Sequence, residues 1–141
     1  MVSSFLIYPI GFVRKQAERV WVDIESQYHD GLLGLDGYSH VIILYWFDRN
    51  DTPEQRGILQ VRPRKNPANP MTGVFATHAP VRPNPIALTT CRVLSIDNLR
   101  LQLETIDALD GSPVIDIKGF IPCHGQPEDY RTPAWVTTHA T

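Results

Sequence analysis

A proline-rich segment at residues 72–88, which reads TGVFATHAPVRPNPIAL, constrains this chain more than any other feature. Pro80, Pro83 and Pro85 lie within six residues of one another. Each proline fixes φ at about −65°, removes a backbone donor and biases the preceding residue toward extended backbone. The segment is therefore excluded from a helix and from the interior of a sheet. It predicts a stiff loop over residues 77–85, which we call the proline loop.

Two interpretations of the proline loop fit its residues equally well. A loop that loses little conformational entropy when held in one shape is suited to presenting polar side chains to a ligand. The side chains available for this are Thr77, His78, Arg82 and Asn84. A stiff surface connection between two strands explains the same prolines, because a proline-rich turn has no chemistry of its own.

The length of 141 residues predicts one domain over residues 1–141, with a core at about 5–122 and a tail at 123–141. The net charge of −2 argues against a protein that binds nucleic acid over its whole surface. Between residues 55 and 96, however, there are six basic residues and no acidic one. This local excess favours a site for phosphate, carboxylate or RNA backbone, although a solvated basic loop is the alternative.

The two cysteines are too few for a disulfide framework, and no residue spacing matches a metal site. We therefore expect no metal, and a reducing compartment. The N-terminus lacks the pattern of a signal peptide, and the longest apolar run, residues 41–47, is too short to cross a bilayer. The sequence accordingly predicts a cytoplasmic protein without a membrane segment.

Alternating or continuous apolar residues predict about six strands and little helix. Residues 19–25 alternate cleanly, with Trp21 on the polar face, and residues 40–47 (HVIILYWF) suit a strand buried on both faces. One short helix is expected from an N-cap at Thr52 through Leu59. The fold class is therefore all-β, a single antiparallel barrel that is closed or nearly closed, with few short helical turns. The predicted strands are 5–13, 19–25, 40–47, 86–96, 99–105 and 114–121.

The end of the aromatic strand is a further candidate for function. Tyr45, Trp46 and Phe47 are followed at once by Asp48 and Arg49. Core packing explains one or two such aromatic residues, whereas three next to charged residues can line a pocket. Their ring faces could stack on a base or attract a cation.

Three stretches taken together resemble the TsaA-like family. They are YSHVIILYWF at 38–47, GVFATHAPVRPNPIAL at 73–88 and IDALDGSPVIDIK at 106–118, and the resemblance extends over residues 10–122. It implies a single antiparallel β-barrel that dimerises and binds S-adenosylmethionine in a cleft at the subunit interface. It also implies methyl transfer to the N6 of threonylcarbamoyladenosine beside the anticodon of tRNA.

The resemblance also assigns residues. Arg82 and Asn84 would shape the proline loop or meet the substrate, and with Asp116 they are the candidates for catalysis. No side chain is identified as a general base, and methyl transfer depends mainly on alignment. The basic stretch between Arg56 and Arg92 would hold tRNA phosphates. The cofactor contacts would be Asp48, Arg49, His78, Leu88, Glu104, Thr105, Ile106 and Asp107.

This sequence departs from the family pattern at several points. His78 stands where arginine is usual, Ala87 where glycine is usual, and Asp48 where some members have histidine. The P-R-Q segment that follows the first strand of longer members has no counterpart, and neither does their C-terminal extension. Two alternatives therefore stay open: a non-catalytic barrel that binds S-adenosylmethionine or RNA, and a methyltransferase for another small substrate.

Overall fold

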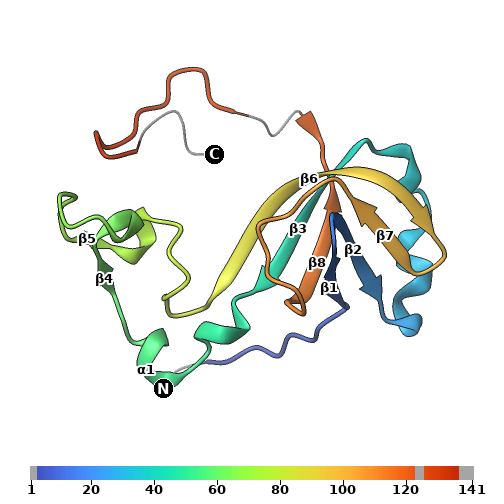
Figure 1. Cartoon of the computed structure of the whole chain (residues 1–141), viewed down its shortest axis with the longest axis horizontal. Helices are drawn as coiled ribbons and strands as arrows, with labels where there is room; N and C mark the ends of the chain where they lie inside the picture. Colours follow the sequence, from blue (N-terminus) through green and yellow to red (C-terminus); the bar gives the residue numbers. More distant parts are fainter. Residues whose placement is uncertain (1–2, 123–125, 137–141) are drawn as a thin grey trace.

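The computed structural model describes residues 3–122 and 126–136, and its core is a closed six-stranded antiparallel barrel (Figure 1). Neighbouring strands follow the order β1-β2-β7-β6-β3-β8, which confirms the predicted fold class. Of the predicted tail, residues 126–136 are described. The barrel strands are β1 (Gly11–Gln16), β2 (Arg19–Ile24), β3 (His40–Trp46), β6 (Ile86–Asp97), β7 (Arg100–Leu103) and β8 (Pro113–Gly119).

The barrel interior is filled by the apolar face of each strand. Seven aliphatic side chains from β1, β2, β3, β7 and β8 are at most 1% exposed, and burial of each one stabilises the fold by about 1.5–3 kcal/mol. The alternation of apolar and polar residues in the sequence therefore corresponds to side chains that face the interior and the exterior of the barrel. The seven are Val13, Val22, Val41, Ile43, Leu101, Leu103 and Val114.

A long excursion separates β3 from β6 and lies to one side of the barrel in Figure 1. We call residues 47–85 the loop lobe. The register of β3 with β6 runs from His40 opposite Arg92 to Trp46 opposite Ile86, so the excursion leaves and returns at the same end of this pair. The lobe contains η3 (Asp48–Asn50), α1 (Pro53–Arg56), β4 (Gln60–Val61), η4 (Pro63–Lys65), β5 (Thr72–Gly73) and η5 (Val74–Ala76).

Local signals explain how the elements begin and end. Thr52 Oγ1 accepts a hydrogen bond from Gln55 N at 3.1 Å, as expected of an N-cap. The helix ends at Arg56 instead of Leu59, because Gly57 follows at its C-terminus. The segment between β2 and β3 forms two 3₁₀ turns, η1 (Ser26–Leu32) and η2 (Leu35–Gly37).

The first strand begins later than expected. The sequence predicts a strand from Phe5, but residues 3–10 lie outside the sheet and β1 starts at Gly11. Pro9 has no amide to donate to a neighbouring strand. Gly11 is then required, because a Cβ there would overlap the carbonyl oxygen of Asp23 on β2.

Two further expectations are corrected by packing. Trp21 is 8% exposed, because the Arg100 guanidinium lies 4.5 Å from its ring centroid and covers it. The β3 strand alternates buried and half-buried residues and is not covered on both faces. In addition, a bulge in β8 makes Val114 pair with Tyr45 while Asp116 pairs with Leu44, so the alternation of faces is interrupted within the predicted strand 114–121.

Candidate functional site

The proline loop is folded back on itself by Arg82. Its Nη1 donates to the carbonyl oxygens of Thr77 at 3.1 Å and of Ala79 at 2.9 Å. Thr77 is buried, donates from Oγ1 to Val74 O at 2.9 Å and accepts from Ala79 N at 3.1 Å. Of the two tasks expected of Arg82, these contacts are those of shaping the loop.

The other end of the proline loop is fixed to the barrel. Pro85 is fully buried, and its carbonyl oxygen accepts from Phe47 N at 2.8 Å. Phe47 also packs edge-on against Tyr45, with ring centroids 5.8 Å apart. The end of the aromatic strand therefore anchors the proline loop to the barrel. Packing thus accounts for Tyr45 and Phe47 at this position.

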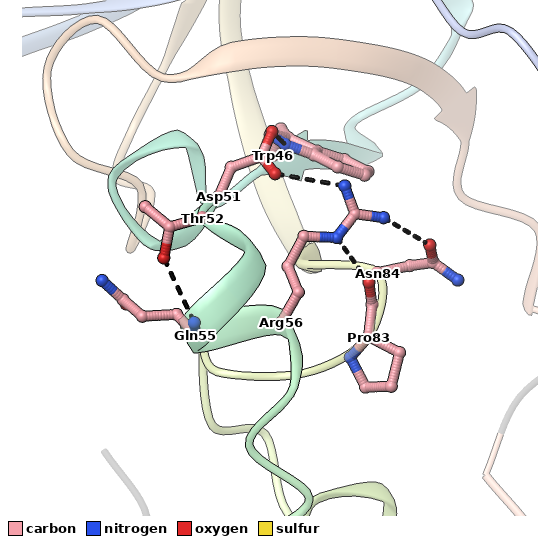
Figure 2. A network of polar contacts seen from close by, with 7 residues as sticks. All are labelled: Trp46, Asp51, Thr52, Gln55, Arg56, Pro83 and Asn84. Atoms are coloured by element: carbon pink, nitrogen blue, oxygen red, sulfur yellow. Dashed lines mark hydrogen bonds and ion pairs between the residues drawn. The ribbon is translucent and has the colours of Figure 1, made fainter.

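Arg56 joins α1 to the proline loop through a network drawn in Figure 2. Its Nε donates to Pro83 O at 2.7 Å, and its Nη2 donates to Asn84 Oδ1 at 3.1 Å. Its Nη1 forms an ion pair with Asp51 Oδ1 at 3.1 Å, and the guanidinium lies 5.8 Å from the centroid of the Trp46 ring. The sequence predicts Arg56 only as a phosphate contact. No local pattern reveals a bond to a residue 28 positions away.

Two of the predicted cofactor residues, Asp48 and Arg49, lie in η3 immediately after β3, and both are exposed. Asn50, the next residue, lines a cavity of roughly 690 Å³ together with His78. The structure thus brings η3 and His78 to the same hollow. The other lining residues are Val61, Arg62, Pro63, Arg64, Lys65, Ala76, Thr77, Ala79, Pro80, Val81, Trp135 and Val136.

The second group of predicted cofactor residues follows β7 and is tied to the barrel. Glu104 N donates to Arg92 O at 3.0 Å, and the two side chains form an ion pair at 3.2 Å. Ile106 is buried and its carbonyl oxygen accepts from Lys15 Nζ at 2.8 Å. Thr105 and Asp107, in contrast, are exposed.

Asp107 acts electrostatically on two buried groups of the barrel. Burial raises the pKa of Cys91 to about 11, and the Asp107 carboxylate adds to this increase. Burial also raises the pKa of Tyr45, while a hydrogen bond with Thr89 opposes the shift and Asp107 supports it. Asp107 is therefore placed on the Tyr45–Cys91 side of the barrel.

Leu88 and Asp116 lie on either side of β3, since both pair with Leu44. Leu88 is 62% exposed, whereas the Asp116 carboxylate accepts from Ile117 N at 2.9 Å and pairs with Lys118 Nζ at 3.2 Å. Asp116 is thus anchored on β8, and Asn84 in the loop lobe. The candidates for catalysis are not joined into one cluster by these contacts.

In one chain the predicted residues therefore form two groups. The first group belongs to the loop lobe and comprises Asp48, Arg49, His78, Arg82 and Asn84. The second group, on the barrel, comprises Leu88, Glu104, Thr105, Ile106, Asp107 and Asp116. Among the described residues, none of the hydrogen bonds and ion pairs given above joins a member of the first group to a member of the second.

Several arginines of the basic stretch bind other groups of the protein itself. Arg62 Nη1 donates to Asn69 O at 2.8 Å, in addition to the contacts of Arg56, Arg82 and Arg92 given above. Arg62, Arg64 and Lys65 line the cavity. Within the described residues, no cluster of three His, Cys, Asp or Glu side chains could hold a metal ion. The described part of the chain also contains no helix that is long and apolar enough to span a membrane.

Known proteins resemble this chain over nearly its whole length. A probable S-adenosyl-L-methionine-binding protein of Pyrococcus horikoshii is 43% identical over 131 residues, which cover 93% of this chain and 89% of that protein. A second such protein, from Methanocaldococcus jannaschii, is 40% identical over 116 residues, covering 82% and 92%. A tRNA (adenine(37)-N6)-methyltransferase of Mus musculus is 39% identical over 108 residues, covering 77% of this chain but 23% of the mouse protein.

Solved structures and a family model agree with these relatives. A crystal structure of TrmO from Pseudomonas aeruginosa superposes with a TM-score of 0.71 and 27% identity, over 94% of this chain and 63% of that one. The chain thus spans less than two thirds of the solved structure. The family model described as the tRNA-methyltransferase O N-terminal domain matches residues 8–125. The resemblance read from the motifs is confirmed, and the chain belongs to the tRNA-methyltransferase O N-terminal domain family.

Proposed function

We propose that this protein is an S-adenosylmethionine-dependent methyltransferase that acts on tRNA. Its target is the N6 of threonylcarbamoyladenosine beside the anticodon. The observation that carries this proposal is membership of the tRNA-methyltransferase O N-terminal domain family over residues 8–125. Relatives of this chain are named S-adenosyl-L-methionine-binding proteins and tRNA (adenine(37)-N6)-methyltransferases.

The residues present fit the cofactor chemically. The cavity beside the proline loop has room for a nucleoside and is lined largely by apolar side chains, with Arg62, Arg64 and Lys65 also in its lining. His78 and Arg49 are suited to bind the cofactor carboxylate, and Asp107 is suited to bind its amino or ribose hydroxyl groups. When bound, S-adenosylmethionine would supply the methyl group from its sulfonium and leave as the neutral thioether, and the acceptor nitrogen would give its proton to water. The chain itself contributes alignment and exclusion of water.

We further propose that a second copy of this chain completes the site. The loop lobe lies to one side of its own barrel in Figure 1, and the predicted cofactor residues are divided between lobe and barrel. Large apolar side chains are exposed on both parts, including Phe75 at 80% and Leu88 at 62%. A homodimer would cover such side chains and bring the lobe of one copy to the barrel of the other.

Calorimetric titration with S-adenosylmethionine tests the cofactor assignment. We expect saturable binding by the wild type, and binding weakened at least about tenfold by Arg82→Ala or Asp107→Ala, since each removes a charged contact or its support. Arg19→Ala, at an exposed arginine of β2, is the matched control and should bind normally. No heat of binding by the wild type would overturn the proposal.

Mixing the two variants with weakened cofactor binding tests the shared site. Arg82→Ala alters the lobe and Asp107→Ala alters the barrel, so a mixed dimer retains one intact combination. We expect methyl transfer to return to a fraction of the wild-type rate on mixing, with a dimeric mass by light scattering. A monomeric mass, or no recovery on mixing, would contradict the shared site.

The departures at His78 and Ala87 favour one second candidate, a barrel that binds S-adenosylmethionine without transferring methyl groups. Ala87 is 7% exposed and pairs with Tyr45, so its methyl group occupies the barrel interior. Label transfer from the cofactor to tRNA that carries threonylcarbamoyladenosine separates the two functions. Binding without transfer to RNA would support the second candidate, and transfer to a metabolite extract would indicate another small substrate. We also propose that the protein is cytoplasmic, which a tRNA substrate supports and fractionation of cells would check.

A further inference from the structure

Arg56 determines which way round the Asn84 amide lies. A guanidinium carries five N–H donors and no acceptor, and Arg56 Nη2 is 3.1 Å from Asn84 Oδ1. An amide placed the other way would direct N–H groups at a cation that cannot accept them. The Asn84 oxygen must therefore lie on the Arg56 side. The oxygen and nitrogen of a side-chain amide are commonly assigned from their hydrogen-bond partners, and here the partner can only donate.

The Arg56 side chain is itself held on several sides. Nε donates to Pro83 O at 2.7 Å, next to Asn84 in the chain. Asp51 accepts from Arg56 Nη1 through Oδ1 and from Trp46 Nε1 at 3.0 Å through Oδ2. The guanidinium is thus fixed in the plane that faces Asn84, and its charge is paired with a carboxylate.

The consequence is an outward-facing donor. Figure 2 shows the Asn84 amide nitrogen pointing away from Arg56, and the residue is exposed. Among the described residues, the lining of the 690 Å³ cavity includes neither Asn84 nor Arg56. The two N–H groups of Asn84 therefore point away from Arg56 at an exposed position outside that hollow, where a large molecule could reach them.

We propose that Asn84 Nδ2 donates a hydrogen bond to an acceptor atom of the tRNA substrate, and that Arg56 is the positioning residue that fixes this donor. The acceptor is a carbonyl oxygen or a ring nitrogen of a nucleoside at or beside the methylation site. This inference rests on the proposed function and assigns a substrate contact within it. It also changes the expected role of Arg56, which acts through Asn84 and not through a phosphate.

Asn84→Asp tests the donor directly. The carboxylate keeps an oxygen for Arg56 and has nearly the same shape, but its outward atom accepts instead of donating. We expect kcat/KM for tRNA to fall roughly 10- to 100-fold, the effect of losing a hydrogen bond and leaving an acceptor unpaired. Affinity for S-adenosylmethionine by calorimetry and the melting temperature should stay close to the wild type.

Arg56→Lys and Arg56→Gln test the positioning role as a matched pair. Both lose the planar contacts to Pro83 and Asp51, so both should lower the melting temperature. Lysine is a donor only and keeps the Asn84 oxygen turned toward it, whereas glutamine can accept from Asn84 Nδ2 and permits the reversed amide. We expect Arg56→Lys to retain several-fold more kcat/KM for tRNA than Arg56→Gln, a difference that loss of stability alone would not produce.

The outcomes are distinct from those of the proposed function. A wild type that transfers no methyl group to tRNA overturns the proposed function, and this inference with it. If the wild type methylates tRNA and Asn84→Asp is equally active, only the donor is wrong. A loss confined to affinity for S-adenosylmethionine would reassign the Asn84 contact to the cofactor, against the inference. Equal activity of the two Arg56 variants would contradict the positioning role.

Discussion

Arg82 Nη1 and the carbonyl oxygen of Thr77 are 3.1 Å apart, and this hydrogen bond closes the proline loop on itself. The same nitrogen reaches Ala79 O at 2.9 Å. A loop whose prolines remove backbone donors has carbonyl groups in excess, and the guanidinium supplies the missing donors. The arginine between the prolines is therefore a structural complement to them.

Replacing Arg82 by alanine should loosen the loop without unfolding the barrel. Thr77 O and Ala79 O would lose their common partner, and the loop would sample more conformations. We expect faster hydrogen exchange of the amides at 77–79, with exchange on β7 and β8 unchanged. Exchange at 77–79 that matched the wild type would show that the prolines alone hold the loop.

Gly11→Ala should destabilise the barrel where β1 begins. A Cβ at this position overlaps the backbone oxygen of Asp23, which cannot rotate away. The expected loss in the free energy of unfolding is about 1–3 kcal/mol, measured by urea denaturation. Gly37→Ala is the matched control, because no atom lies within 4 Å of its added Cβ. Equal stability of the two variants would contradict the close approach of β1 and β2.

Cys91 should react slowly with iodoacetamide in the folded protein. Burial raises its pKa to about 11 from an ordinary value of 9.0, so near pH 8 the reactive thiolate is about 100-fold rarer than in an ordinary thiol. Measurement in a Cys123→Ser background isolates this thiol. Asp107→Asn removes a carboxylate that raises the pKa, so it should speed the reaction. A slower or unchanged rate in Asp107→Asn would place Asp107 away from Cys91.

The same proton links stability to pH. The folded protein binds the Cys91 proton more tightly than the unfolded chain does, so the unfolded state loses it first as the pH rises. This contribution to stability is complete below about pH 9 and is lost as the pH approaches about 11. In Cys91→Ala, the fall in unfolding free energy over this range should be smaller than in the wild type. An unchanged slope would show that another group dominates.

His78→Arg should strengthen binding of S-adenosylmethionine. An arginine is always charged and can form two parallel hydrogen bonds with a carboxylate, a geometry that an imidazole ring does not offer. We expect roughly 3- to 10-fold tighter binding by calorimetry, equivalent to about 1 kcal/mol. His29→Arg, at an exposed site on η1, is the control and should have no effect. No gain in His78→Arg would place the cofactor carboxylate elsewhere.

Much of the barrel could be predicted from the sequence because its signals are local. Alternating apolar residues in β2 and β7 record the two faces of each strand, and Thr52 with Pro53 marks the start of α1. The turn at Asn98 adopts a left-handed conformation with φ of 55°, which suits an asparagine between β6 and β7. Each of these features depends on residues only a few positions apart.

The errors concern contacts between distant parts of the chain. Trp21 is covered by Arg100, and the bulge at Ile115 shifts the register of β8 on β3. Arg56 binds Pro83 and Asn84, which lie 27 and 28 positions further on. No periodicity records such pairings, because the partner is chosen by the path of the chain. For the same reason the sequence names residues of the candidate site but does not show that they form two groups.

The two anchors of the loop lobe carry an evolutionary consequence. Phe47 N bonds to Pro85 O at 2.8 Å, so the excursion starts and finishes at one fixed point on a closed cylinder of strands. Changes of length or composition between these anchors involve no residue of the six barrel strands. During evolution the sequence of the loop lobe can therefore change, and with it the ligand that the lobe recognises, while the barrel strands are retained.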